Sequence, residues 1–144
     1  MTATEPLATD SPADDTSAGD HPSGRIVAIA GPVVDVEFPS GAIPEINTAL
    51  EFDLTIGGDT EVVTVVAEVA QQIGEGRVRA VAMKPTDGLT RGTPVRNLGR
   101  GISMPVGDVT LGHVFNVIGE PLDTGGEPLE GITERWPIHR DAPA

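Results

Sequence analysis

The sequence predicts an all-β protein, a small six-stranded closed barrel followed by the first helix and the loops of an incomplete second domain. About six short valine-rich runs lie between residues 25 and 98, and turn-forming residues separate them. Hydrophobic residues make up 38% of the chain and aromatic residues only 3%, so the core must consist mainly of Val, Ile, Ala and Leu, which favour strands. The sequence pattern changes at Met104-Pro105, where the second domain is expected to begin.

Residues 1–23 are expected to form a disordered acidic tail. They hold five acids, no Lys or Arg, and almost nothing large and apolar. Such a segment cannot bury enough surface to offset the entropy lost on ordering. The barrel domain is therefore expected over residues 24–104.

The barrel is predicted to begin with the runs RIVAIA (25–30) and VVDVEF (33–38). In the second run Val and Phe alternate with two acids, which indicates a strand with one buried face. Gly31-Pro32 joins the runs, and a hairpin, a bent strand or a bulge are all compatible with it.

Four more strands are predicted, at residues 49–56, 61–70, 77–83 and 94–98. Tight turns are expected at Gly57-Gly58-Asp59 and Gly74-Glu75-Gly76. Closing these strands into a barrel would remove the exposed edges that so much valine makes prone to aggregation.

The second domain, residues 105–144, is predicted to open with an amphipathic helix over 110–118. Four apolar residues have the spacing of one helical face: Leu111, Val114, Phe115 and Ile118. Thr110 or Asp108 can cap its start and Gly119 can end it. The rest of the segment offers this helix nothing to pack against, so the domain is expected to be incomplete.

Charge is unevenly distributed along this chain of net charge −13. Residues 26–76 hold nine acids and no base, whereas residues 77–107 hold six bases and one acid. We favour internal pairing and solvation of these blocks over contact with a partner, which stays open. The overall sign argues against nucleic acid as a partner.

The cell compartment is inferred from what the sequence lacks. No cysteine is available for disulfides or thiolate metal sites, and no apolar run is long enough to cross a membrane. The start of the chain resembles neither a secretory signal nor a transit peptide. A cytoplasmic bacterial protein is the expectation.

No catalytic, cofactor-binding or metal-binding residue is predicted in this chain. A phosphate-binding P-loop needs a lysine after its glycines, and the only lysine, Lys84, stands between Met83 and Pro85. The G-x-G pairs at 74–76 and 99–101 are interpreted as turns. Ser103 has no nucleophile-elbow context.

The histidines and the single tryptophan are interpreted without a ligand. His21, His113 and His139 show no metal-ligand spacing and are expected to be partly exposed polar residues. Trp136, followed by Pro137, is expected to anchor a loop on a domain, with ligand stacking as the less favoured alternative.

Several stretches together resemble the opening of the F-type ATP synthase β subunits. They are GRIVAIAGPVVDVEFPSGAIPEINTAL, VAEVAQQIGEGRVRAVAM, TDGLTRGTPVRNLGRGISMPVG, TLGHVFNVIGEPLD and ERWPIHRDAP. The resemblance spans residues 24–143, and GEPLD and RWPIHR are its most specific parts. The acidic tail is longer than the family core requires.

The resemblance implies a fold and a set of partners. The barrel would join α subunits in the crown of an alternating hexamer, and 105–144 would begin an α/β nucleotide-binding domain. The full subunit makes ATP from ADP and phosphate with Mg, using a transmembrane proton gradient. It meets the central-stalk γ subunit through C-terminal parts missing here, and the membrane proton channel only indirectly.

The resemblance also implies a place in the cell and a limit on activity. The complex would lie peripherally on the cytoplasmic face of the bacterial membrane. This chain is expected to be a fragment that ends before the P-loop and is inactive alone. The alternative is a free-standing barrel that binds a ligand or oligonucleotide, as OB-folds do.

Overall fold

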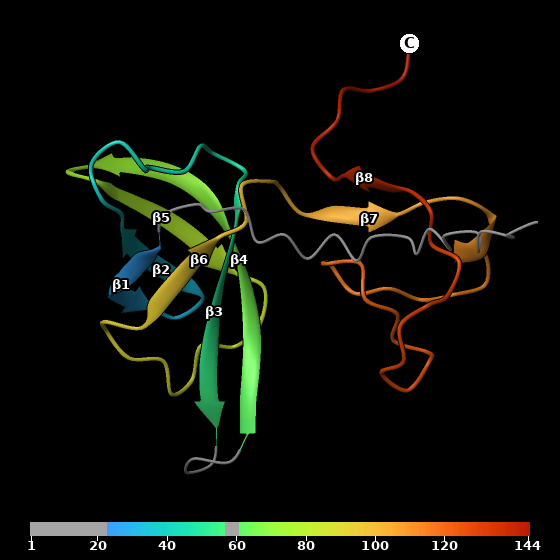
Figure 1. The fold of residues 1–144 in the computed structure, drawn as a ribbon, viewed down its shortest axis with the longest axis horizontal. Coiled ribbons are helices and arrows are strands. Elements are labelled where there is room, and N and C mark those ends of the chain that lie inside the picture. Colours follow the sequence, from blue (N-terminus) through green and yellow to red (C-terminus); the bar gives the residue numbers. More distant parts are fainter. Residues whose placement is uncertain (1–22, 57–60) are drawn as a thin grey trace, which may run out of the picture.

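The computed structural model describes residues 23–56 and 61–144, and within them it forms a six-stranded barrel and a separate two-stranded sheet (Figure 1). The barrel strands are β1 (Gly24–Ala30), β2 (Val33–Glu37), β3 (Ala49–Ile56), β4 (Glu61–Gly74), β5 (Arg77–Ala82) and β6 (Pro94–Asn97). The second sheet contains β7 (Ser103–Pro105) and β8 (Arg135–Pro137). The expected disordered tail, apart from Ser23, and the turn predicted at 57–59 lie outside the described residues.

The barrel is closed, as predicted. Its strands pair antiparallel in the order β1-β2-β5-β4-β3-β6, and β6 pairs with β1 to complete the circle. Only two residue pairs join β6 to β1, but the backbone of Ile26 extends the seam. Its N–H donates to Thr93 O at 3.0 Å and its carbonyl accepts from Gly92 N–H at 2.7 Å. No edge strand of the barrel is therefore left fully unpaired among the described residues.

The connection at Gly31-Pro32 is a hairpin. β1 and β2 pair around it with Ala30 opposite Val33, and Gly31 has a φ of 59°, which glycine adopts without strain. A bulge also occurs, but inside β1, between Ile26 and Ala28. The hairpin is thus the correct one of the alternatives for Gly31-Pro32, and the bulge lies elsewhere, in β1.

The core lies inside the barrel and follows the alternation of the strands. In β2, Val34 and Val36 face inward and the two acids outward, as predicted. The core side chains are Ile26, Val34, Val36, Phe38, Leu50, Phe52, Leu54, Val65, Ala67, Val69, Val78, Ala80, Ala82 and Val95. Aliphatic side chains packed around two phenylalanines thus fill this small cylinder.

β3 and β4 form an arm that projects beyond the other strands (Figure 1). They pair over eight residues each, whereas β6 meets β3 only at Leu50 and Glu51. β4 runs to Gly74, past the end predicted at residue 70, because two bulges bend it and keep it paired with β5.

The helix predicted over 110–118 is wrong. A single 3-10 turn occupies Asp108–Thr110, and turns and an isolated bridge from Phe115 to Pro121 follow it. Isolated helices of this length are marginal in water, and this one would have no surface on which to bury its stripe. Leu111 and Val114 are accordingly 74% and 60% exposed. Gly119 does adopt a positive φ, 77°, but in a turn and not at a helix end.

The two-stranded sheet starts directly after the barrel. Ser103–Pro105 pairs with Arg135–Pro137, although the barrel domain was expected to reach residue 104. Trp136, expected to anchor a loop on a domain, lies opposite Met104 in the two-stranded sheet. It is 45% exposed, and the guanidinium of Arg140 lies 3.7 Å from its ring centroid.

Candidate functional site

The outer face of β1, β2 and β5 carries a ladder of ion pairs. Glu37 accepts from Arg25 at 2.7 Å and from Arg77 at 3.3 Å, and Asp35 accepts from Arg79 at 2.8 and 3.0 Å. The partners are directly opposite each other in the strand register. Hydrogen bonds from Arg25 and then Arg77 lower the pKa of Glu37, and the bond from Arg79 lowers the pKa of Asp35.

A second ion-pair cluster lies on β3 and β6. Arg96 donates to Asp53 at 2.7 and 3.1 Å and approaches Glu51 at 3.5 Å, while Thr64 donates to Asp53 at 2.9 Å. The bond from Arg96 lowers the pKa of Asp53. Strand pairing in the barrel therefore places basic strands beside acidic ones, and the two charge blocks pair internally through Arg77, Arg79 and Arg96.

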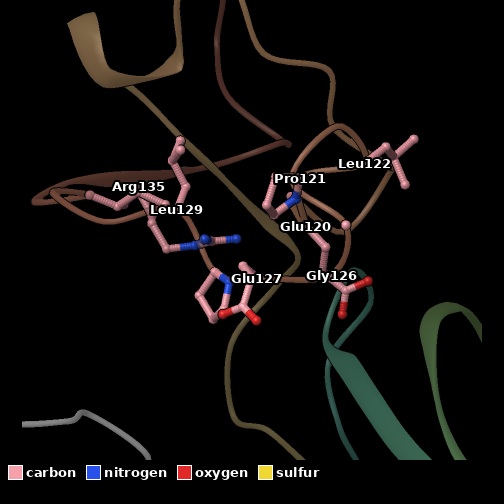
Figure 2. Close-up of a pocket in the computed structure, with 11 residues that line it drawn as sticks. Glu120, Pro121, Leu122, Gly126, Glu127, Leu129 and Arg135 are labelled. Atoms are coloured by element: carbon pink, nitrogen blue, oxygen red, sulfur yellow. The ribbon is translucent and has the colours of Figure 1, made fainter.

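A mostly apolar hollow of about 590 Å³ lies within the loops that follow the barrel (Figure 2). Its walls come from two loops and β8: Gly119, Glu120, Pro121, Leu122, Gly125, Gly126, Glu127, Pro128, Leu129, Ile132 and Arg135. Figure 2 shows the Arg135 side chain extending into the same space as Glu120 and Glu127. Its lining includes no Ser, Cys, His or Lys that could act as a nucleophile.

Arg135 holds this region together through neutral oxygens. Its guanidinium donates to Ser103 Oγ at 3.1 Å, Ser103 O at 2.9 Å and Ile118 O at 3.3 Å. A Cβ at Gly119 would come within 2.5 Å of Arg135 Nη2, so glycine is required for this close approach. Burial, and secondarily the nearby Arg100, lower the pKa of Arg135.

A groove of about 590 Å³ separates the outer face of β3 and β4 from the region of β7 and β8. Lys84, Arg100 and Arg135 line it together with Glu51 and Glu120. Lys84, which is not part of a P-loop, thus lines the same groove as two arginines. Its ammonium donates to Thr64 O at 3.4 Å, its one hydrogen bond to a described residue.

The two described histidines each contact a carboxylate. His113 Nδ1 lies 2.8 Å from Asp123 Oδ2, and His139 Nε2 lies 2.9 Å from Glu68 Oε2. The hydrogen bond from His113 lowers the pKa of Asp123. Sequence reasoning placed both histidines as partly exposed but missed these partners, which are 10 and 71 residues away along the chain. His21 lies outside the described residues.

The residues considered for chemistry in the sequence do not come together. Ser103 Oγ accepts from Arg135 and has no described base beside it. Gly74–Gly76 forms the turn between β4 and β5, as interpreted, whereas Gly99 lies in a bend, where its N–H donates to Asn97 Oδ1. Across residues 23–56 and 61–144, no group of three His, Cys, Asp or Glu could hold a metal ion.

These observations define a class of protein, a closed antiparallel barrel with ion-paired outer faces and a loop-rich extension. No helix in the described part of the chain is long and apolar enough to span a membrane. A family model described as "ATP synthase alpha/beta family, beta-barrel domain" matches residues 26–99, which is 74 of the 144 residues. The chain belongs to the ATP synthase alpha/beta family. Membership indicates assembly within an ATP synthase-type complex that is associated with a membrane.

Proposed function

We propose that this chain is the N-terminal region of a β-type subunit of an F-type ATP synthase and that its barrel serves assembly of the α/β hexamer. The observation that carries the proposal is the closed barrel over the residues that match the family's barrel domain. The motifs GEPLD at 119–123 and RWPIHR at 135–140 resemble the β subunits and support the β-type assignment.

The outer surface of the barrel supports an assembly role. A closed barrel offers almost no strand edge to a partner, so neighbours must be recognised through outward side chains. Most outward charges on β1, β2 and β5 are already paired. Apolar side chains remain exposed on the arm and on β5, namely Ile56 at 46%, Val62 at 66% and Val81 at 37%. Exposed aliphatic groups of this kind suit a protein interface.

Mixing the chain with an α-type barrel domain tests the proposal. Light scattering after size-exclusion chromatography is expected to show a hetero-complex, which Val62→Asp weakens and the matched exposed change Leu111→Asp does not. Persistent monomers at every salt concentration would contradict the assembly role. Complexes that form equally well without the α-type partner would contradict the β-type assignment alone.

ATP synthesis belongs, in this proposal, to the complete subunit, which binds ATP or ADP with Mg and is driven by a proton gradient. These 144 residues contain no glycine-rich loop that leads into a lysine. The purified chain is therefore expected to hydrolyse no ATP. Turnover above background that co-purifies with the monomer would refute this part.

The alternative of an oligonucleotide-binding barrel gains no support from the barrel surface. Single-strand binding relies on exposed aromatic rings that stack on bases. Phe38 and Phe52 are buried in the core, and the other described aromatic residues, Phe115 and Trp136, lie outside the barrel. The assembly role is the one that we retain.

A further inference from the structure

The basic residues of this chain divide into two groups by their partners. Four of the nine Lys and Arg side chains form ion pairs on the barrel, and Arg140 lies against the ring of Trp136. The other four, Lys84, Arg91, Arg100 and Arg135, form no ion pair with a carboxylate of the described residues. Of these, Lys84, Arg100 and Arg135 line the groove beside β3 and β4.

Three separate parts of the chain bring these cations to one place. Lys84 follows β5, Arg100 lies in the connector after β6, and Arg135 begins β8. Arg135 is fixed by its bonds to Ser103 and Ile118, all of which go to neutral oxygens. A fixed cation that lacks a counter-charge is a ready partner for an anion, because charge-assisted hydrogen bonds are the strongest in proteins.

We propose that this groove binds an oxyanion, a phosphate or carboxylate group of a small molecule, through Lys84, Arg100 and Arg135. Its volume of about 590 Å³ falls within the range of small-molecule sites. This site is independent of the subunit assignment above, since it depends only on the three cations.

Two acids line the same groove and limit how the anion can lie. Glu51 is approached by Arg96 at 3.5 Å, which offsets part of its charge. Glu120 accepts from the side-chain amide of Asn116 at 2.7 Å, a neutral partner that brings no positive charge beside it. The anion is therefore expected to lie toward Lys84, Arg100 and Arg135 and away from Glu120.

The net charge of −13 does not prevent such binding at physiological salt. The Debye length is then about 8 Å, so distant carboxylates are largely screened while groups within the groove are not. An anion in the groove is therefore expected to respond mainly to the charges that line it.

Nuclear magnetic resonance titration at constant ionic strength tests the proposal. Inorganic phosphate and succinate are added separately against chloride, and the amide shifts of residues 84, 100 and 135 are followed. Saturable shifts at these three positions are expected. Saturation with phosphate alone identifies a phosphate site, and saturation with both identifies a general oxyanion site. Absence of saturation with either overturns the proposal.

Substitutions separate this site from general charge effects. Lys84→Gln and Arg100→Gln are each expected to weaken binding about tenfold, which corresponds to about 1.4 kcal/mol. Glu120→Gln, which can still accept from Asn116, is expected to tighten it. The control Arg91→Gln removes the same charge from an exposed loop and is expected to leave affinity unchanged. Equal losses of affinity in Lys84→Gln, Arg100→Gln and the control Arg91→Gln would overturn the proposal. Arg135→Gln is not used, because Arg135 also holds Ser103 and Ile118.

Discussion

The barrel and the segment after it use different interactions to hold their shape. Nearly every buried apolar side chain of the described residues lies in the barrel, and Ile102 and Pro105 are buried beyond it. Beyond it, residues 103–144 rely on glycine turns, a three-residue ladder between β7 and β8, and the guanidinium of Arg135. Apolar side chains such as Leu111 and Leu122 stay largely exposed there.

This difference shows that alternating apolar and polar residues can build a buried core in a short chain when the strands close into a barrel. In the barrel, each inward residue meets inward residues of other strands, so burial is shared around the circle. The extension has apolar residues too, but no second layer covers them. The barrel should therefore tolerate loss of surface pairs, while the extension should depend on single polar contacts and backbone geometry.

Core truncation should give the largest effect. Phe52→Ala removes the largest fully buried side chain and is expected to cost about 3–5 kcal/mol of unfolding free energy. Leu111→Ala, at a position 74% exposed, should change stability by less than about 0.5 kcal/mol. Urea denaturation followed by circular dichroism measures both. Similar losses for the two variants would remove the distinction between the regions.

Backbone geometry in the extension should give the next largest effect. Gly119→Ala forces a positive φ on alanine and a clash with Arg135 and Pro105, together worth about 2–4 kcal/mol locally. Gly112 has a φ of 82° but no atom near its Cβ direction, so Gly112→Ala should cost only about 1 kcal/mol. Hydrogen exchange of the amides in β7 and β8 is the measurement. Equal effects would show that Arg135 does not pack on Gly119.

Surface pairing on the barrel should matter less and should depend on pH. The bond from Arg96 keeps the pKa of Asp53 below its ordinary 3.8, so the pair stabilises the fold above that pH. The contribution is lost as pH falls through the lowered pKa of the folded state. Asp53→Asn should therefore reduce stability at pH 7 by less than about 1 kcal/mol, because solvent screens the pair.

The stability of Asp53→Asn should converge with that of the parent chain in acid. Denaturation series from pH 7 to pH 2 give the comparison. Asp87→Asn, at an exposed residue without a described ion pair, is the control and should show no such dependence. A gap that persists at pH 2 would mean that Asp53 acts through packing and not through its charge.

The contact between His139 and Glu68 should give the smallest effect. It is the one side-chain hydrogen bond that joins residues 103–144 to the barrel within the described residues. Glu68→Gln should speed amide exchange at residues 135–139 by less than about tenfold, since exposed pairs rarely exceed about 1 kcal/mol. His113→Gln should affect only the loop at 113–123. Slower exchange of the barrel amides in Glu68→Gln would contradict a purely local role for this contact.

Sequence patterning predicted the barrel well because alternation reports directly on burial. The strand predicted at 49–56 has the bounds of β3, and the predicted alternation of residues 33–38 matches the burial of β2. The same reasoning failed at 110–118, where helical spacing is present but no partner surface exists. Val114 and Leu111 fit one face of a helix, yet that face would have remained exposed. No burial therefore favoured the helix over the turns at Gly112 and Gly119.

The surface chemistry was only partly predictable. Acidic and basic blocks suggested internal pairing, but Arg79 lies opposite Asp35, 44 residues away in the sequence, only because β2 pairs with β5. The groove could not be predicted, because Lys84, Arg100 and Arg135 are up to 51 residues apart and no common sequence motif links them. Only the fold of the chain between them brings these side chains together.

Native-state hydrogen exchange over the whole chain tests the central claim most directly. The amides of β1 to β6 are expected to share one high free energy of exchange, equal to that of global unfolding. The amides of β7 and β8 are expected to exchange through openings of lower free energy. Protection of β7 and β8 equal to that of the barrel, or early opening of the seam between β1 and β6, would contradict it.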